Sequence, residues 1–290
     1  MIGVVGATGR VGGRLTRELI AANDSVRVLS RDPAKAKTTF DGSAEVGYLD
    51  YGDPATLRSA LRGVDQVFLS HGTSGTQVED EIALIDAAAA VGVDHLVKLS
   101  AANGTGEQRM IVGDWHHEIE KHLATVGLAA TLLRPATFID VLARAFSAVA
   151  NGTWGGAAGT GLASLIDTRD VADVASVVLR EGASKHAEKA YRLTGPEGVS
   201  MHDIARRLGA LLGATVEYRE RSVAQQAARL TADGLPPLTV EVLLGLDESI
   251  RDGWHAEPTT VVADLTGTAP RPVDDWLREH VAEFRATEKR

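Results

Sequence analysis

The 290-residue chain contains no cysteine, and aromatic residues make up only 4% of it. Without cysteine there can be no disulfide, no thiolate metal ligand and no cysteine nucleophile. Basic residues are also fewer than acidic ones: the chain has 30 Lys and Arg and 39 Asp and Glu, which gives a formal net charge of -9 at pH 7. This acidic balance argues against a nucleic acid or an anionic membrane as partner, since both bind basic surfaces.

Long apolar runs are missing as well. The longest candidate, IALIDAAAAVGV at residues 82–93, is interrupted by Asp86 and is shorter than the roughly 18 residues of a membrane-spanning helix. The N-terminal MIGVVGATGR lacks the charged segment and long apolar core of a secretory signal. We therefore expect a soluble, cytoplasmic protein whose partner is a small molecule.

The first half of the chain alternates short β-branched runs with Ala- and Leu-rich helical stretches. The predicted strands are Ile2–Val5, Val26–Leu29, Ala44–Leu49, Gln66–Ser70, His95–Ser100 and Ala129–Leu133. The predicted helices between them are Arg10–Ala22, Pro33–Phe40, Pro54–Leu61, Gln77–Val91 and Glu107–Val126. This alternation predicts βαβ units and a parallel sheet. The strands are nearly all apolar, which is typical of a sheet covered by helices on both faces.

The second half is less regular. The Gly-rich segment NGTWGGAAGTG, residues 151–161, predicts a loop that is free to move over a ligand. The residues after it predict strands at 162–167, 191–195 and 215–220, a helix at 170–182, and mostly helical structure beyond Ser200. The fold class is therefore α/β: a Rossmann-type, doubly wound parallel sheet at 1–150 and a smaller, mostly helical lobe at 151–290. Residues 163–182 are expected to pack back on the sheet.

The motif GATGRVG directly follows the first predicted strand and opens the first predicted helix. Glycines permit a tight turn and let the backbone approach a pyrophosphate, which then binds at the helix N-terminus. A glycine triplet can also serve only turn geometry and packing, but the strand-before, helix-after context favours a dinucleotide site. The predicted cofactor-binding residues here are Gly6, Thr8, Gly9, Arg10, Val11 and Gly12.

The end of the second strand indicates which dinucleotide binds. NAD-binding domains place an acidic residue there for the ribose 2′-hydroxyl, whereas this chain has Ser30 and Arg31, and Asp32 before Pro33 looks like a helix cap. A guanidinium pairs well with a 2′-phosphate, and such bonds contribute about 1.5–3 kcal/mol, or roughly ten- to hundredfold preference for NADPH over NADH. Lys35 would assist. Alternatively, Arg31 is an ordinary surface residue at a strand end.

Further cofactor contacts are expected where the next strands end, because ligands lie at the carboxyl ends of parallel strands. Asp50 and Tyr51 would sit near the adenine. Ser70, His71 and Gly72 would lie along the cofactor toward the nicotinamide.

These motifs together resemble the NmrA-like family of atypical short-chain dehydrogenases. The resemblance covers about residues 1–285 and is carried by GATGRVG, SRDPAKA, LDYGDPATLRSAL, LVKLSAANG, HHEIEKHLATVGLAATLLRPATFID, IDTRDVADVASVVL and YRLTGPEGVSMHDIARRLG. It implies a Rossmann domain with a smaller C-terminal lobe and a substrate bound between them. Members of the family include NADPH-dependent quinone oxidoreductases, azoreductase-like proteins, isoflavone-reductase relatives and dinucleotide-binding redox sensors.

The segment WHHEIEKHL, residues 115–123, has the composition of a site. Zinc is disfavoured because His117 and His122 are five residues apart, which separates them by roughly 140° around a helix, so we expect no metal. The remaining charged residues read as a solvated face with pairs such as His117–Lys121 and Glu118–His122.

One position of this segment carries the catalytic hypothesis. Typical short-chain dehydrogenases use a Tyr-x-x-x-Lys dyad on this helix, and the resemblance places the Tyr equivalent at Val112 and the Lys equivalent at His116. Both members of the dyad are therefore missing. His116 remains as an acid near neutral pH, or as a group that holds the nicotinamide ribose or an outgoing carbonyl.

Hydride transfer to a quinone does not require the Tyr-x-x-x-Lys dyad, since water or a weak acid can complete the protonation. Phe138 and Trp154 are candidates to line the binding pocket of a flat aromatic acceptor. Alternatively, Phe138 is a core residue, and Trp154 belongs to a lid or to an oligomer contact in a homodimer. The leading hypothesis is an NADPH-dependent reductase of quinones or similar carbonyl or azo acceptors. The alternatives are a non-catalytic NADP(H)-binding redox sensor and a dedicated biosynthetic reductase.

Overall fold

The computed structural model describes residues 1–102 and 110–285, and the chain divides into two compact units. The first comprises Met1–Glu107, Val112–Pro135 and Thr168–Arg192, and the second Gln108–Ile111, Ala136–Asp167 and Leu193–Arg290. The first unit breaks at Pro135, where the sequence placed a boundary at residue 150. Residues 168–192 return to the first unit, where the sequence expected 163–182 to pack back. They return because a helix there packs on the first helix of the chain and the strand after it extends the sheet.

The first unit is built around a seven-stranded sheet with the order β3-β2-β1-β4-β5-β6-β8. Its strands are β1 (Ile2–Val5), β2 (Val26–Ser30), β3 (Glu45–Tyr48), β4 (Gln66–Leu69), β5 (His95–Leu99), β6 (Ala130–Pro135) and β8 (Lys189–Leu193). Its helices are α1 (Arg10–Ala21), α2 (Pro33–Thr39), α3 (Pro54–Leu61), α4 (Gln77–Val91), α5 (Ile111–Leu123), α7 (Thr168–Glu181) and α8 (Ala183–His186). The predicted helix at 107–126 is found as α5, and its first residues, 107–109, lie outside the described residues.

The strand order gives the sheet its doubly wound form. The chain steps outward from β1 through β2 to β3, and then returns to place β4 on the other side of β1. All ladders among β1 to β6 are parallel. The switch point, where ligands bind in such sheets, therefore lies between the carboxyl ends of β1 and β4. The predicted fold class is confirmed.

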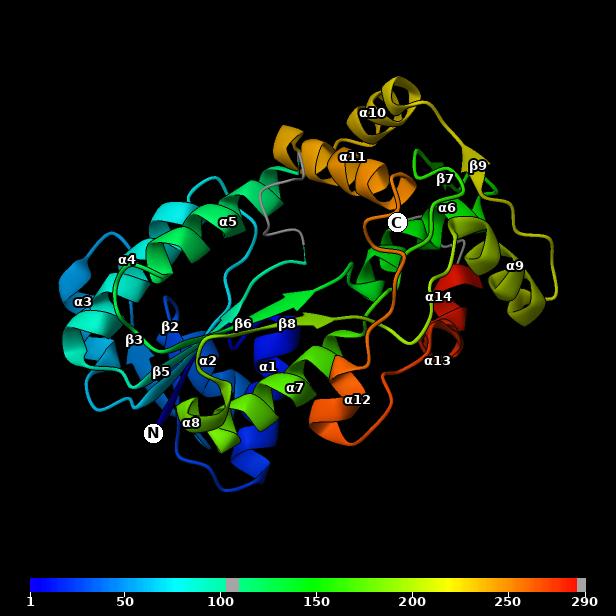
Figure 1. Cartoon of the computed structure of the whole chain (residues 1–290). Coiled ribbons are helices and arrows are strands. Elements are labelled where there is room, and N and C mark those ends of the chain that lie inside the picture. The colour runs from blue at the N-terminus through cyan, green and yellow to red at the C-terminus, as the bar shows by residue number, and fades with distance from the viewer. Residues whose placement is uncertain (103–109, 286–290) are drawn as a thin grey trace. The chain divides into compact units, whose positions relative to one another are not determined.

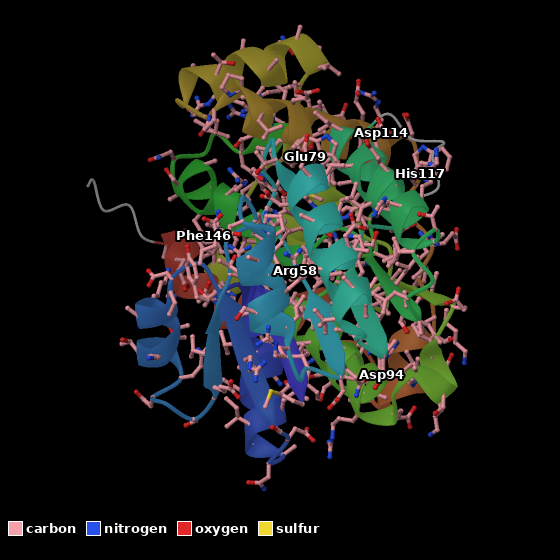
Figure 2. All side chains as sticks on the ribbon, turned by 90° about the vertical axis from the view of Figure 1, so that its left-hand side faces the viewer. Arg58, Glu79, Asp94, Asp114, His117 and Phe146 are labelled. Atoms are coloured by element: carbon pink, nitrogen blue, oxygen red, sulfur yellow. The ribbon has the colours of Figure 1, made fainter. Side chains whose placement is uncertain are left out.

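Helices cover both faces of this sheet (Figure 1). α1 packs against α7 on one face, and α3 packs against α4 on the other, beside α5. Arg58 on α3, Glu79 on α4 and Asp114 on α5 are exposed polar residues of that second layer (Figure 2). Between these helices and the sheet lies an apolar core that includes Leu57, Leu61, Leu84, Ile85, Leu96 and Ile119.

The second unit is mostly helical and has its own core. Its elements are a 3-10 helix (Ile139–Ala145), α6 (Phe146–Ala150), β7 (Gly155–Gly156), α9 (Met201–Leu212), β9 (Arg219–Glu220), α10 (Val223–Ala232), α11 (Pro237–Arg251), α12 (Val261–Thr266), α13 (Val273–Glu279) and α14 (Val281–Arg285). The strand predicted at 162–167 is wrong: the segment makes only the isolated bridges Ala163–Val199 and Phe138–Ile166. The strand predicted at 215–220 is reduced to Arg219–Glu220.

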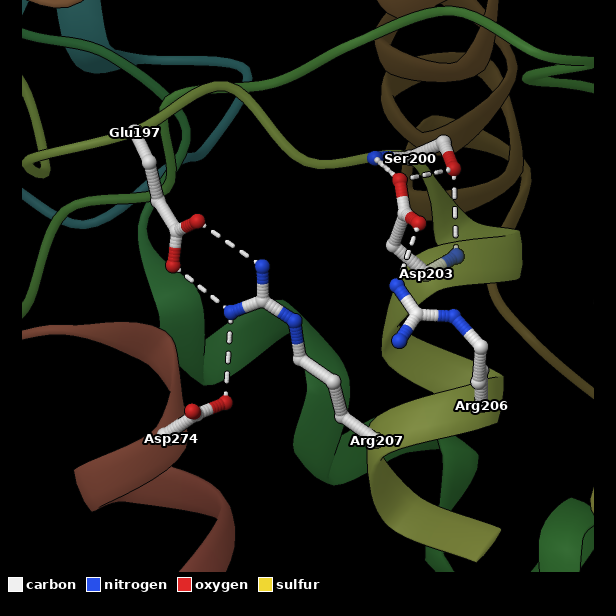
Figure 3. A network of polar contacts seen from close by, with 6 residues as sticks. All are labelled: Glu197, Ser200, Asp203, Arg206, Arg207 and Asp274. Atoms are coloured by element: carbon white, nitrogen blue, oxygen red, sulfur yellow. Dashed lines mark hydrogen bonds and ion pairs between the residues drawn. The ribbon is translucent and has the colours of Figure 1, made fainter. Parts of the chain in front are cut away.

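Two arginines on α9 show how polar contacts fix this unit (Figure 3). Arg207 binds both carboxylate oxygens of Glu197, at 2.6 and 2.8 Å, and Asp274 of α13 at 3.2 Å. One turn earlier, Ser200 and Asp203 form a capping box, in which the Ser200 hydroxyl accepts from the Asp203 N–H at 3.1 Å. Arg206 first, and then Ser200, lower the pKa of Asp203 to about 2.

The Gly-rich segment at 151–161 is tied down by its neighbours. β7 pairs with β9, and the Arg221 guanidinium donates to the carbonyl oxygens of Gly155 and Thr153, both at 2.7 Å. A Cβ on Gly155 would stand 2.2 Å from the Arg219 carbonyl oxygen, and one on Gly161 would stand 2.1 Å from that of Ile250. These glycines are therefore required by close backbone packing, which is a different use of glycine from the freedom of movement that the sequence suggested.

Candidate active site

The turn between β1 and α1 has the geometry of a phosphate cradle. Gly6 has a φ of +79°, a left-handed conformation that favours glycine, and its carbonyl accepts from the Gly9 N–H at 2.8 Å. A Cβ on Gly12 would stand 2.5 Å from the Gly6 carbonyl oxygen, so the third glycine allows α1 to begin directly on the turn. No side-chain hydrogen bond from a described residue caps α1, which leaves its N-terminus suited to a pyrophosphate.

The same turn lies against the end of β4. A Cβ on Gly6 would stand 2.5 Å from the carbonyl oxygen of Ser70. The close approach brings Ser70, and after it His71 and Gly72, to the turn at the switch point of the sheet. Thr8, Gly9 and Arg10 are exposed there, whereas Val11 and Gly12 are buried beneath them.

Three further predicted residues lie in contact at the ends of β2, β3 and β4. The guanidinium carbon of Arg31 is 5.9 Å from the centroid of the Tyr51 ring, and that ring is 5.2 Å from the His71 ring in an edge-on arrangement. His71 Nε2 lies 3.1 Å from Asp80 of α4. Burial, followed by the charges of Glu81 and Asp80, raises the pKa of Tyr51, so this ring is neutral at physiological pH.

The acids near this edge support the backbone. Asp32 caps α2 by accepting the Lys35 N–H at 2.9 Å, as its place before Pro33 predicts. Asp50 accepts the Gly52 N–H at 2.9 Å in the turn after β3. Arg31 is exposed, and no carboxylate in the described part of the chain forms an ion pair with it. The end of β2 therefore presents a cation where NAD-binding domains present an acid.

His116 lies in a buried polar network that the sequence did not reveal. The Lys98 ammonium on β5 donates to the Glu81 carboxylate on α4 and lies 3.2 Å from His116 Nδ1. Gln77 donates to the other Glu81 oxygen at 2.8 Å. Lys98 and Glu81 are fully buried, and His116 is 8% exposed. Burial, and then the Lys98 charge, lower the pKa of His116 well below its usual range.

One turn along α5, Glu120 is the centre of a second buried network. Its carboxylate accepts from the Ser100 hydroxyl at 2.6 Å and from the Arg134 guanidinium at 2.6 and 3.1 Å. Ser100 follows β5 and Arg134 belongs to β6. Glu120 is thus fully occupied in joining α5 to the ends of two strands.

The remaining histidines of WHHEIEKHL behave as a helix face. His122 lies 2.6 Å from Asp86 on α4 instead of pairing with Glu118, because the neighbouring helix offers a closer carboxylate. Within residues 1–102 and 110–285, no three His, Asp or Glu side chains are grouped so as to hold a metal ion. None of the helices in those ranges is both long enough and apolar enough to cross a membrane.

The two aromatic residues expected at the acceptor occupy different places in the second unit. Trp154 is buried, stands 5.2 Å from the Tyr218 ring in an edge-on contact, and lines a cavity of about 150 Å³. Asp247 also lines it and accepts the Ala157 N–H at 2.8 Å, and burial raises the pKa of this carboxyl. Phe138 is half-buried, is not among the residues that line this cavity, and forms a backbone bridge with Ile166.

Known proteins with similar sequences and structures are named reductases or oxidoreductases, and several of these names include NADPH or NAD(P)H. Residues 6–181 match the profile of a family described as NAD(P)H-binding. The chain is 35% identical over 286 residues to (4-alkanoyl-5-oxo-2,5-dihydrofuran-3-yl)methyl phosphate reductase of Streptomyces griseus, covering 98% of this chain and 99% of the relative. It is 31% identical over 287 residues to NAD(P)H azoreductase of Xenophilus azovorans, covering 99% and 100%.

A solved structure is similar over the same length. The crystal structure of an NADPH-dependent quinone oxidoreductase of Escherichia coli, complexed with NADPH, superimposes with a TM-score of 0.90. The two chains are 29% identical, and the match covers 96% of this chain and 99% of that one. The cradle and the Arg31–Tyr51–His71 contacts lie at the carboxyl edge of the sheet, within residues 6–181 that match the profile.

Proposed function

The chain belongs to the NAD(P)H-binding family, and on that premise we propose that it is an NADPH-dependent reductase of quinones or of related carbonyl or azo acceptors. The family expected from the sequence motifs is confirmed by the profile match and by the azoreductase and quinone oxidoreductase relatives. The observation that carries the proposal is the glycine turn at the switch point, with a cation at the end of β2.

The residues present fit the cofactor. Gly6, Gly9 and Gly12, with the uncapped start of α1, would hold its pyrophosphate. Arg31, already placed against Tyr51, would pair with a 2′-phosphate, assisted by Lys35. Bound there, NADPH supplies a hydride, and Ser70, His71 and Gly72 at the end of β4 would line its path toward the nicotinamide.

Quinone reduction by hydride transfer requires mainly that the protein hold the acceptor next to the nicotinamide. A quinone takes up one hydride and one proton to give a hydroquinone, with NADPH converted to NADP⁺. By the family resemblance, Val112 takes the place of the tyrosine of typical short-chain dehydrogenases, so the chain would offer no phenol there. Water would supply the proton once the hydride has been transferred.

The second unit contains a cavity that would hold one aromatic ring of the acceptor. The cavity beside Trp154 and Tyr218 has the size of a single aromatic ring, since an engineered cavity of roughly 150 Å³ binds benzene. Arg144 and Arg221 contribute to its lining and Asp247 adds a carboxyl, so the cavity combines apolar walls with polar groups. Phe138 does not line this cavity, so its proposed contact with the acceptor rests on the sequence alone.

Steady-state turnover tests the proposal. NADPH oxidation would be followed at its absorbance band with a panel of benzoquinones, naphthoquinones and azo dyes, with NADH as the matched control. We expect multiple turnover that prefers NADPH. If calorimetry shows NADPH binding while the whole panel gives no turnover, the reductase proposal is wrong.

A second candidate is a dedicated biosynthetic reductase, favoured by the 35% identity to the butenolide phosphate reductase. Such an enzyme would leave common quinones untouched and reduce an unsaturated lactone that carries a phosphate. The third, a redox sensor without turnover, would bind NADP⁺ and NADPH with strongly different affinities, which the same calorimetry measures.

A further inference from the structure

The buried contact between Lys98 and His116 fixes more than the packing of α5. A lysine ammonium donates hydrogen bonds and has no lone pair to accept one. Its partner is the fully buried Glu81 carboxylate, with which it forms an ion pair away from solvent. Nδ1 of His116, 3.2 Å from this ammonium, must therefore be the acceptor.

This assigns the protons of the imidazole ring. A neutral histidine carries one N–H, and when Nδ1 accepts, that proton is on Nε2. Nε2 has no hydrogen-bond partner in the described part of the chain, and it is not one of the buried atoms left without a partner. With 8% of the residue exposed, this N–H is available to a ligand.

We propose that Lys98, held by Glu81, is a positioning residue that fixes His116 as a permanently neutral Nε2–H donor to the carbonyl oxygen of the acceptor. The donation to an acceptor rests on the proposed function, whereas the state of the ring does not. Negative charge develops on the carbonyl oxygen as the hydride arrives, and a donor placed in advance stabilises it. His116 keeps its proton, and water protonates the oxygen afterwards.

Among the described residues, the two carboxylates of these buried networks already have partners. Glu120, one turn along the same helix, is occupied by Ser100 and by the Arg134 guanidinium. Glu81 accepts from the Lys98 ammonium, which lies next to His116. The Lys98 ammonium lies beside Nδ1, on the buried side of the imidazole ring. Its positive charge therefore opposes the addition of a second proton to the ring.

The state of the ring can be measured without turnover, by ¹⁵N NMR of histidine-labelled protein. We expect a pyridine-type shift for His116 Nδ1 and a pyrrole-type shift for Nε2, with no titration between about pH 5.5 and 8. His122 on the same helix, which is partly exposed beside Asp86, gives a second imidazole signal for comparison. A His116 ring that titrates in this range, or carries its proton on Nδ1, would overturn the proposal.

A variant tests whether Lys98 is the cause. Lys98→Met alone would leave the buried Glu81 carboxylate without its counterion, so the test variant combines Glu81→Gln with Lys98→Met. The control is Lys121→Met, which removes an exposed lysine from α5. We expect the double variant to show mixed His116 tautomers and a higher His116 pKa, and Lys121→Met to match the wild type. An unchanged His116 spectrum in the double variant would show that Lys98 does not set the ring.

The donor role has its own test. His116→Phe should lower kcat with a quinone by about a hundredfold and leave the Kd for NADPH unchanged. An unchanged kcat would refute the donor role even if the ring state is as described. Absence of turnover in the wild type would instead refute the proposed function, while the NMR result stands by itself.

Discussion

In the first unit, the guanidinium carbon of Arg31 lies 5.9 Å from the centroid of the Tyr51 ring, which joins the carboxyl ends of β2 and β3. The ring limits the directions that the guanidinium can take, and cation–π contacts of this kind contribute about 0.5–1 kcal/mol at exposed sites. Arg31 is thereby held at the edge where a ribose phosphate would bind.

Replacing Arg31 should therefore change cofactor choice. We expect Arg31→Ala to lower kcat/KM for NADPH by roughly ten- to hundredfold and to change that for NADH little. Arg58→Ala, which removes an exposed arginine from α3, is the matched control. An unchanged NADPH/NADH ratio in Arg31→Ala would show that this guanidinium does not meet the 2′-phosphate.

The Gly-rich segment at 151–161 should respond to added bulk as packed structure does. Gly155→Ala would place a Cβ 2.2 Å from the Arg219 carbonyl oxygen, so we expect a loss of about 1–3 kcal/mol in the free energy of unfolding. Gly75→Ala is the control, because nothing lies within 4 Å of a Cβ there. Equal stability of the two variants in urea unfolding would argue for a loose loop instead.

Trp154 should affect the acceptor and not the cofactor. Trp154→Leu removes one wall of the cavity that Tyr218 shares, so we expect the KM for the quinone to rise about tenfold while the Kd for NADPH stays the same. Trp254→Leu, at a residue 43% exposed, is the comparison. Parallel changes in both parameters would point to a general loss of structure.

His95 should make the protein less stable in mild acid. It is fully buried between Gln66 and Thr131, and burial, followed by the charge of His186, lowers its pKa to about 4. The unfolded chain, with a histidine pKa of about 6.5, then binds more protons between these two values. The stability contribution is therefore complete above pH 6.5 and is lost as the pH falls toward 4.

From this one residue we expect the free energy of unfolding to be about 2 kcal/mol smaller at pH 5 than at pH 8. Urea unfolding at the two pH values measures the difference. His95→Gln should reduce the difference by that amount, and His202→Gln, at a side chain that is 42% exposed, should not. If both variants keep the wild-type pH dependence, His95 does not titrate as described.

The fold of the first unit was predictable because each of its elements carries a strong local signal. Runs such as IGVV are wholly buried in the structure, as an all-apolar strand between two helical layers must be. The glycine turn was predictable for a similar reason. A Cβ on Gly9 or Gly12 would crowd the Gly6 carbonyl oxygen, so the need for glycine arises within the motif GATGRVG itself.

The network around His116 could not be derived in this way. Lys98 interrupts a strand whose other residues give no hint of which face it occupies, and its partner Glu81 comes from a different helix. A lysine between apolar residues in a strand expected to be buried was the available signal. The segment 151–161 is a loop, as expected, apart from the two residues of β7. Its packing could not be predicted, because composition does not distinguish glycines that permit movement from glycines that permit close packing.

The measurement that tests the central claim most directly is the reduction of a naphthoquinone by NADPH carrying deuterium at the transferable C4 position. The account predicts one hydroquinone formed for each NADPH consumed, a slower reaction with the deuterated cofactor, and much weaker turnover with NADH. If NADPH binds but none of the acceptors in the panel causes it to be consumed, the proposed reductase function is wrong.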